Sequence, residues 1–462
     1  MPSSRKTIIG KSVLLTALSI TALLTMLMAA MVPGKTSAQT NPTNTPAPTA
    51  TTAVIQAGTG SMQLVYWNGL TGGDGTTMDK MVDAFVKDNT DISVRQEQYV
   101  WDTLYQKLQA AFVAGEPPDV IVLHNSEIPQ FQKLGLFAPV DDLFDTNGGP
   151  LPLKDFTEPA LDATVIGGKH YGVLLDNHGF GTWVNLNLFK SAGVDENTAP
   201  PKSPDEFIKL ATKLTLDKNG KHPDEAGFDL QNVTQWGTGI DWTRVQFESF
   251  LYQFGGSVVS ADLKTATINS QAGQQALQAM YDLIYKYHVA PDPNKTNGYN
   301  AFQAGTIAIM PTGTWFRNNL VDLHKEIKWT VWPMLQLGPK PGVWASAHVM
   351  FISSTLTGDK LAAAKKMVVY LSNHNDIWAQ SGQVPARISV QKGLDPETYK
   401  SNILFGQGFQ QFGRLEPPLT DLVEVQNAFD PELSAALNGQ KTVKQALDDA
   451  NARMQTILDR GQ

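Results

Sequence analysis

Carboxylates and histidines are the side chains of this sequence best suited to chemistry, but their spacing marks no catalytic or metal-binding set. Hydrolysis of a glycoside needs two carboxyl groups that face each other across a cleft, one of them with a raised pKa. Asp176, Asp241 and Glu248 are candidates, yet no spacing identifies a pair among the 44 acidic residues. None of the eight histidines, His124 and His178 among them, has another at the i+4 spacing of a zinc-binding helix.

Signatures of covalent and phosphate chemistry are also missing. The sequence has no Gly-x-Ser-x-Gly elbow, no cysteine and no Gly-x-x-x-x-Gly-Lys-Ser/Thr loop. The cluster Gly72-Gly73-Asp74-Gly75 lacks the spacing of a dinucleotide fingerprint and predicts a flexible turn. We therefore expect no catalytic residue, no metal ligand and no cofactor.

Tryptophan near turn residues is the chemically useful feature that remains. A pyranose offers a flat patch of C–H bonds to an aromatic face and a rim of hydroxyl groups to amides, carboxylates and guanidinium groups. The alternative is that a given indole belongs to the core, where tryptophan is usually mostly buried. The tryptophans that lie near Gly, Asn, Asp or Thr are Trp67, Trp101, Trp236, Trp242, Trp315, Trp344 and Trp378.

Short apolar runs that end in turn residues predict strands that lead into one site. Residues 306–310 are too short a run for a helix, and they lead through Pro311 into Gly313-Thr314-Trp315. Because ligands of α/β proteins bind at strand ends, one site fed by several strands is predicted. The other runs of this kind are 62–67 before Asn68-Gly69, 119–123 before His124-Asn125, and 328–331 before Trp332-Pro333.

Strand and helix patterns alternate from Met62 onward, which predicts an α/β fold. Residues 62–123 follow the order βαβαβ, the opening of a mostly parallel sheet. Ser203-Pro204-Asp205-Glu206 is a capping box, and Ser270 is placed to cap another helix. One sheet would be large for this length, so two α/β lobes are predicted.

The composition and the N-terminal residues indicate where the protein is located and which partners it can have. The 462 residues have a net charge of −8 and no dense basic cluster, which argues against a nucleic-acid partner. Residues 1–38 are predicted to be a signal peptide, with Arg5, Lys6 and Lys11 before an uncharged stretch. Residues 39–60, rich in Thr and Pro, are predicted to be a disordered linker, either a tether or a leader remnant. Export to the periplasm or the outer face of the membrane is expected, and the apolar stretch is long enough to serve as an anchor if it is not cleaved.

Four segments resemble a known family when taken in chain order. The sequence is similar to the extracytoplasmic solute-binding proteins of carbohydrate ABC importers, the family of maltose- and glycerol-phosphate-binding proteins. The segments that resemble it are Trp67-Asn68-Gly69-Leu70-Thr71, Gly115-Glu116-Pro117-Pro118-Asp119-Val120, residues 302–310 leading into Gly313-Thr314-Trp315, and Gly382-Gln383-Val384-Pro385-Ala386-Arg387.

The resemblance implies a two-lobed periplasmic-binding-protein fold with discontinuous lobes and a hinge. By similarity, the first lobe takes residues 61–174 and 343–386, and the second takes 175–342 and 387–462, with crossings near Leu175-Asp176-Asn177 and near Gly342. It further implies a monomer that captures a neutral mono- or oligosaccharide, closes, and delivers it to a membrane permease without chemistry. An exported carbohydrate-active hydrolase, a glycerol-phosphate-binding protein and a structural surface module remain alternatives.

The resemblance and the strand ends together give a candidate ligand site. By similarity, Trp315 stacks on the sugar and Arg387 reaches it from elsewhere in the chain. Asp176, Asn177 and His178 lie where the chain is expected to cross between the lobes. The full set of expected ligand-binding residues is Trp67, Asn68, Trp101, His124, Asp176, Asn177, Trp236, Asp241, Trp242, Gly313, Trp315, Trp344, His348 and Arg387.

Overall fold

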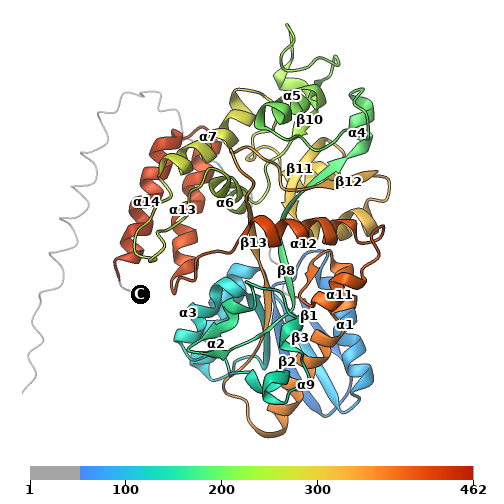
Figure 1. The fold of residues 1–462 in the computed structure, drawn as a ribbon, viewed down its shortest axis with the longest axis vertical. Helices are drawn as coiled ribbons and strands as arrows, with labels where there is room; N and C mark the ends of the chain where they lie inside the picture. Colours follow the sequence, from blue (N-terminus) through green and yellow to red (C-terminus); the bar gives the residue numbers. More distant parts are fainter. Residues whose placement is uncertain (1–52, 461–462) are drawn as a thin grey trace, which may run out of the picture. The chain divides into compact units, whose positions relative to one another are not determined.

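Two large β-sheets organise the part of the chain that the computed structural model describes, residues 53–460 (Figure 1). These residues belong to one compact unit. The predicted signal peptide and the predicted linker up to residue 52 lie outside the described residues. In spatial order, the first sheet consists of β1 (Ala53–Ala57), β3 (Ile92–Gln98), β2 (Met62–Asn68), β4 (Val120–His124), β14 (His348–Ile352) and β7 (Val173–Leu174).

The second sheet is built around one long strand, β8 (Asp176–Asn185), which pairs with four others. β12 (Trp329–Trp332) and β15 (Val384–Pro385) pair with β8 beside the main path of the sheet. In spatial order, the main path is β16 (Gly413–Arg414), β13 (Val343–Ser346), β8, β11 (Ile307–Gly313), β10 (Val233–Thr238) and β9 (Leu216–Asp217).

Each sheet and the helices that surround it form a lobe, the first lobe below and the second above in Figure 1. The helices of the first lobe are α1 (Gly75–Asp88), α2 (Trp101–Ala114), α3 (Ile128–Lys133), α9 (Gly358–Asn373), α10 (Asn375–Trp378) and α11 (Ile388–Gly393). Those of the second are α4 (Leu186–Ser191), α5 (Pro204–Leu214), α6 (Thr243–Gln253), α7 (Gln271–Tyr285), α8 (Gly298–Gln303), α12 (Lys400–Phe412), α13 (Leu422–Leu437) and α14 (Val443–Leu458).

Local signals account for several of these elements. The Ser203 side chain accepts a hydrogen bond from the Glu206 amide and caps α5, and Ser270 caps α7 in the same way. From β2 onward the strands β2, β3 and β4 alternate with the helices α1 and α2, as βαβ units require. β11 is buried along its whole length, and it continues through Pro311 to Gly313 because pairing with β8 holds it extended. A break at Pro311 was expected from the sequence.

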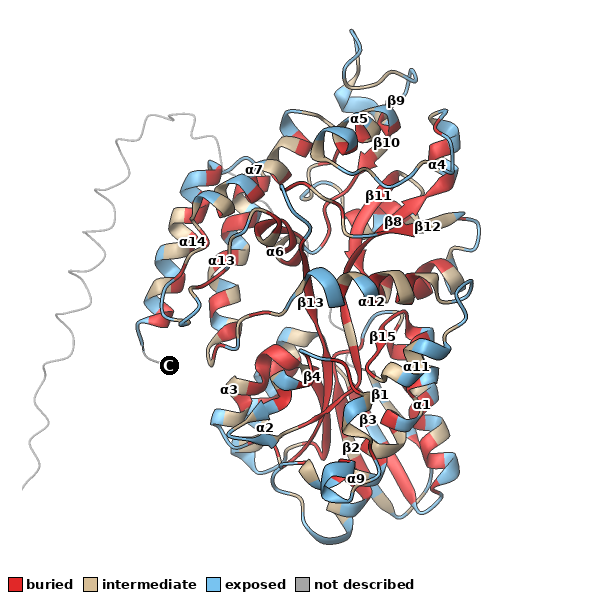
Figure 2. Cartoon of the chain, viewed as in Figure 1, coloured by how far each residue is buried: buried red, intermediate tan, exposed pale blue. Residues whose placement is uncertain are grey.

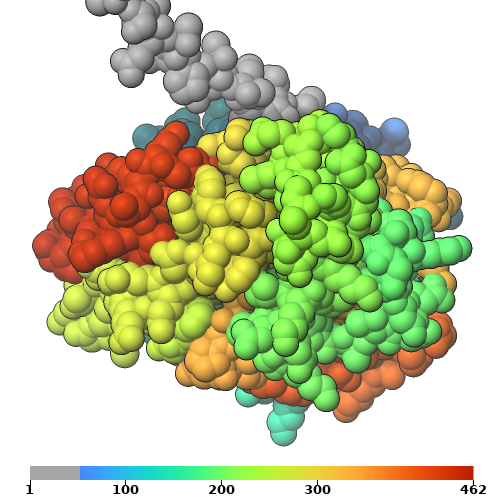
Figure 3. All heavy atoms as spheres, turned by 90° about the horizontal axis from the view of Figure 1, so that it is seen from above, coloured from blue at the N-terminus to red at the C-terminus, as the bar shows by residue number. Residues whose placement is uncertain are grey.

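Burial follows the two sheets (Figure 2). The first lobe has one apolar core, and the second has two clusters, one between its helices and one beside β8. In the second lobe α7 lies beside the C-terminal helices, and the hydroxyl of Tyr285 donates to the Leu437 carbonyl at 3.0 Å (Figure 3). No helix among residues 53–460 is long and apolar enough to cross a membrane.

Three boundaries differ from those expected. Residues 384–385, assigned to the first lobe, form β15 in the second sheet, whereas α11, assigned to the second lobe, lies with the first. Residues 53–57, assigned to the disordered linker, form β1, which pairs antiparallel with β3 and starts the first sheet earlier. The chain passes between the sheets at Leu175 and at Ala347, whereas the second crossing was expected near Gly342. The reason is that β13 pairs with β8 of the second sheet before β14 enters the first.

Candidate functional site

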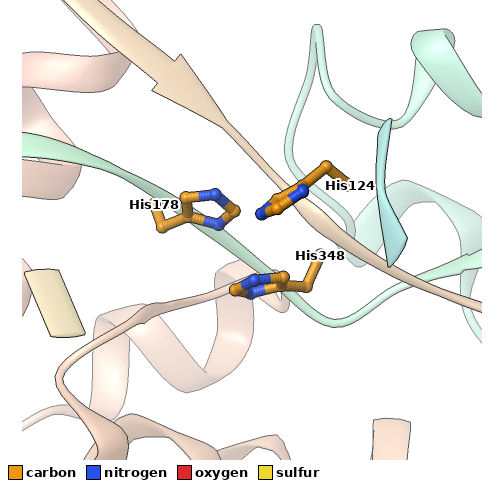
Figure 4. Close-up of side chains that lie close together, drawn as sticks. All are labelled: His124, His178 and His348. Carbon is orange, nitrogen blue, oxygen red and sulfur yellow. The ribbon is translucent and has the colours of Figure 1, made fainter. Parts of the chain in front are cut away.

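Three histidines, drawn in Figure 4, meet where the chain passes between the lobes, and Asp176 is hydrogen-bonded to two of them. His124 ends β4, His348 begins β14, and the two are direct cross-strand partners in the first sheet. His178 lies near the start of β8, opposite Ser346 of β13. One nitrogen from each imidazole lies within 4.8 Å of the others.

Asp176 holds this junction together. Its carboxylate accepts hydrogen bonds from Nδ1 of His178 at 3.0 Å, Nδ1 of His348 at 2.7 Å and Nε1 of Trp378 at 2.8 Å. The backbone amide of His348 donates a fourth, at 3.1 Å. Asp176 is fully buried, so these four donors replace the water that an ionised carboxylate would otherwise require.

At the junction, Asp176 is ionised and His178 is neutral. Burial alone would raise the pKa of Asp176, but His348 and the hydrogen bonds from His178 and His348 outweigh it and hold this pKa below its usual range. Burial, with His348 nearby, lowers the pKa of His178 to about 4. His178 is therefore neutral at pH 7, and because the carboxylate can only accept, the proton of its ring is on Nδ1.

His124 is oriented by aromatic neighbours. Its Nδ1 is hydrogen-bonded to the Tyr105 hydroxyl at 2.5 Å, and burial followed by the nearby His348 holds its pKa well below the usual range. The Trp101 ring lies 4.1 Å from the His124 ring and is stacked on His348 at 5.4 Å. A Cβ at Gly69 would overlap the Trp101 ring, which explains why glycine follows Asn68.

A continuous series of rings extends from this cluster into the second lobe. His178 is stacked on His348 at 4.1 Å and contacts Trp344 at 5.8 Å and Trp315 at 6.2 Å. Trp315 in turn contacts Trp242, which is 54% exposed. Besides Trp242 at its exposed end, the series brings together five more predicted tryptophan and histidine positions from both lobes. They are Trp101, His124, Trp315, Trp344 and His348.

Both lobes contain buried polar atoms without a partner among the described residues. In the first lobe they include Nε1 of Trp67, Nδ2 of Asn68 and Oδ1 of Asp74. In the second they include Nε1 of Trp344 and Oγ1 of Thr238. Burial raises the pKa of Asp74, which is close enough to His348 and Asp176 to respond to their charges. Such atoms are costly to bury and predict a hydroxyl-rich ligand or ordered water.

The lobes also touch beside Asp74. Nδ2 of Asn318 donates to the carbonyl of Gly73 at 2.9 Å, and Nε2 of Gln383 donates to Oδ2 of Asp74 at 3.0 Å. Asp74 belongs to the glycine-rich segment expected to be only a flexible turn. The aspartate between glycines is the sequence feature that could have marked this contact between the lobes.

No carboxylate of the predicted hydrolytic set is free. Asp176 is held as described above. Asp241 accepts from the Thr312 hydroxyl at 2.6 Å, and burial raises its pKa to about 6 despite that bond. Glu248 accepts from Arg244 at 3.1 Å.

Three of the expected site residues do not join the cluster. Arg387 donates to Asp155 at 2.8 Å and lies over Phe156 at 5.1 Å, so its guanidinium is occupied within the first lobe. Trp236 packs beside β8 in the core of the second lobe. The Asn177 amide donates to Thr157 in the wall of a small pocket.

The remaining expected residues lie at strand ends near the rings. The Trp67 ring packs edge-on against Tyr99 at 5.2 Å, and Oδ1 of Asn68 accepts from the Leu70 amide to close the turn. Gly313 ends β11, and a Cβ there would overlap the Trp315 ring. Glycine at this position lets the indole fold back over the strand end.

The sequence did not identify two residues that organise the cluster. Tyr105 was not singled out, because it is an ordinary position on the inner face of α2. Trp378 was noted as a tryptophan near turn residues but not as a site residue, and it is fully buried with its indole bonded to Asp176. Both act through tertiary contacts that leave no local pattern.

Comparison with known proteins gives consistent matches across the lobes. The family model for bacterial extracellular solute-binding proteins matches residues 68–374. A putative binding protein of Brucella abortus is 23% identical over 261 residues, 56% of this chain and 59% of the relative. The arabinooligosaccharide-binding protein of Halalkalibacterium halodurans is 23% identical over 296 residues, 57% of this chain and 56% of the relative. The chain thus aligns with somewhat less than three-fifths of the length of these curated relatives.

Solved structures match a larger share of the chain. An ABC substrate-binding protein of Listeria monocytogenes, solved in complex with cycloalternan, superimposes with a TM-score of 0.73 at 24% identity. The match covers 86% of this chain and 99% of that one. The predicted two-lobed periplasmic-binding-protein fold is confirmed.

Proposed function

We propose that this chain, which belongs to the bacterial extracellular solute-binding protein family, captures a neutral mono- or oligosaccharide between its lobes for an ABC importer. The observation that supports the proposal most is the presence of partnerless buried polar atoms in both lobes together with the aromatic rings that extend from the lobe junction. The saccharide-binding relatives named above support the same ligand class.

A sugar has groups that suit both the aromatic rings and the partnerless polar atoms. The faces of Trp315 and Trp344 offer apolar platforms for the C–H patches of a pyranose. Hydroxyl groups of a sugar both donate and accept, so they can pair with an indole donor such as that of Trp344 and with a carboxylate oxygen such as that of Asp74. A phosphate-bearing ligand would instead require cations, and Arg387, the basic residue expected to reach the ligand, is paired with Asp155.

We further propose that the protein binds without turnover, as a monomer on the outer side of the membrane. The carboxylates Asp176, Asp241 and Glu248 are each held by fixed donors, which supports binding over hydrolysis. Delivery to a permease follows from the proposed transport role, because the surface shown to the membrane changes when lobes close.

A ligand screen tests this proposal. The full-length protein is heated with a panel of mono- and oligosaccharides, polyols and glycerol phosphates, and ligand integrity is followed by chromatography. A sugar at 100 times its Kd adds about 2.7 kcal/mol of stability and raises the Tm by a few degrees. Breakdown of the sugar would favour the hydrolase, a response only to glycerol phosphate would favour that ligand, and no response to the panel would contradict the proposal.

Two variants connect the response to the ring series. Trp242→Ala changes a half-exposed indole at the end of the series and should weaken sugar binding about 10-fold, since one stacking contact is worth about 1 kcal/mol or more. Trp329→Phe is the matched control, because Trp329 packs on Trp183 in the second-lobe core. Equal affinities of the two variants would place the ligand elsewhere.

A further inference from the structure

We propose that His124, His178 and His348 form a binding site for a divalent transition-metal ion, Zn²⁺ being the ion that suits them best. Their nitrogens lie within 4.8 Å of one another, and the three rings turn toward one another in Figure 4. Three imidazoles are a ligand set that Zn²⁺ uses in proteins, with a fourth position left for water or another oxygen. The proposal concerns an ion, and it stands independently of the proposed sugar.

Hydrogen bonding leaves the metal-binding nitrogen of each ring available. The Asp176 carboxylate accepts from Nδ1 of both His178 and His348, so in the neutral form of each ring the free lone pair is on Nε2. Nδ1 of His124 is hydrogen-bonded to the Tyr105 hydroxyl, whose oxygen can accept a hydrogen bond from it. Among the described residues, no hydrogen bond uses Nε2 of any of the three.

The surroundings match those of a metal site. Histidines that bind metal almost always donate their other ring N–H to a carboxylate, a carbonyl or water, which fixes the ring and raises its basicity. Here one carboxylate serves two rings and a phenol serves the third. A purely structural cluster would not require three imidazoles to converge with all three Nδ1 atoms turned toward partners.

Strand register sets the backbone geometry. His124 and His348 are directly opposite each other on β4 and β14, where cross-strand Cβ atoms are about 5 Å apart. His178 faces them from β8, two residues after Asp176. Tetrahedral coordination at about 2.1 Å sets the nitrogens about 3.4 Å apart, so side-chain rotation of the order of 1 Å is enough to close the site.

The position of the three histidines determines how an ion reaches them and what a bound ion does to the lobes. His178 and His348 are buried, whereas the His124 side chain is 18% exposed and gives a route for the ion. Because His124 and His348 belong to the first sheet and His178 to the second, a bound ion would tie the two lobes at their crossing.

Metal titration of the full-length protein tests the site. The protein is treated with EDTA, exchanged into metal-free buffer, and titrated with Zn²⁺ against a chromophoric chelator and with Co²⁺ in the visible range. One equivalent of Zn²⁺ and the intense absorption of tetrahedral Co²⁺ are expected. His124→Gln should weaken Zn²⁺ binding at least 100-fold, and Tyr105→Phe, which alters only a positioning residue, about 10-fold.

His324→Gln is the matched control, since His324 lies outside the cluster and contacts Glu326 and Gln303. Wild-type protein that binds no Zn²⁺, or His124→Gln protein that binds like wild type, would overturn the proposal. Because a variant can fail to fold, the wild type is also treated with diethylpyrocarbonate and mapped by mass spectrometry. Zn²⁺ should protect His124 at least 10-fold but not His324, and equal labelling of His124 with and without Zn²⁺ would also overturn it.

Discussion

The buried carboxylate at the lobe junction is fully hydrogen-bonded, whereas several buried polar groups near the neighbouring strand ends have unpaired atoms. At the junction, Asp176 has four donors and its neighbours are fixed. At the strand ends and in the turn that follows β2, Asn68, Asp74 and Trp344 each keep a buried polar atom without a partner among the described residues. The junction is complete in itself, whereas the strand ends are incomplete without a further molecule.

The difference separates groups that maintain the fold from groups that await a ligand. A saturated buried carboxylate stabilises only the arrangement around it, and removing it leaves several donors unpaired. A partnerless donor destabilises the ligand-free protein and gains its partner on binding. Substitutions in the two regions should therefore change stability by different amounts and in different directions.

The largest effect is expected from Asp176→Ala. Three side chains and one amide would lose their common acceptor in a buried position, so the free energy of unfolding should fall by about 3 kcal/mol or more. Urea unfolding followed by fluorescence measures this. Asp91→Ala is the control, because Asp91 is exposed and has no side-chain bond among the described residues. Equal midpoints for the two variants would show that the junction does not stabilise the fold.

A pH-dependent effect is expected at Asp241. Burial raises its pKa from 3.8 to about 6 in the folded protein, so between these values the folded state binds the extra proton. Stability should therefore fall as pH rises from about 4 to 6, by an amount on the order of 2–3 kcal/mol. Asp241→Asn should remove that part of the slope in Tm against pH. A slope unchanged from wild type would mean that Asp241 ionises normally.

Two buried threonines at neighbouring strand ends sharpen the comparison. Thr312 donates to Asp241, and Thr238 has a partnerless hydroxyl, although both side chains are fully buried. Thr312→Val should lower the free energy of unfolding by about 1–2 kcal/mol, because the carboxylate loses its donor. Thr238→Val should raise it by up to about 1 kcal/mol in the absence of sugar. Similar destabilisation in both variants would remove the distinction between the two regions.

The smallest effect is expected at Arg387. Its ion pair with Asp155 is partly accessible, so Arg387→Ala should lower the free energy of unfolding by about 1 kcal/mol. Sugar affinity should stay within twofold of wild type, because the guanidinium is occupied away from the ring series. Calorimetric titration with the sugar found in the screen measures this, and a tenfold loss would restore Arg387 to the ligand site.

Strand ends were predictable from the sequence because their signals are local. Short apolar runs followed by Asn68, His124 or Trp315 identify where strands stop, and Ser203 and Ser270 mark helix starts. Since parallel and neighbouring strands end at shared edges, their end residues were expected to meet.

Pairings between distant segments were not predictable. The facing of His124 and His348 depends on β4 and β14 being antiparallel neighbours, which neither strand encodes alone. The absence of an i+4 histidine pair pointed away from a metal site, yet sheet register supplies the proximity that a helix would give. Arg387 was assigned to the ligand by resemblance, and its partner Asp155 became visible only in three dimensions.

Pairing of β1 with β3 has a mechanical consequence. The described chain begins at Ala53, and five residue pairs connect β1 to the edge of the first sheet. A pull along this strand loads the five pairs in shear, so they resist together instead of separating one after another. Tension from the N-terminal side is therefore taken up by the first lobe. It reaches the second lobe through the crossings, of which Leu175 and Ala347 are two, and through direct contacts such as that of Asn318 with Gly73.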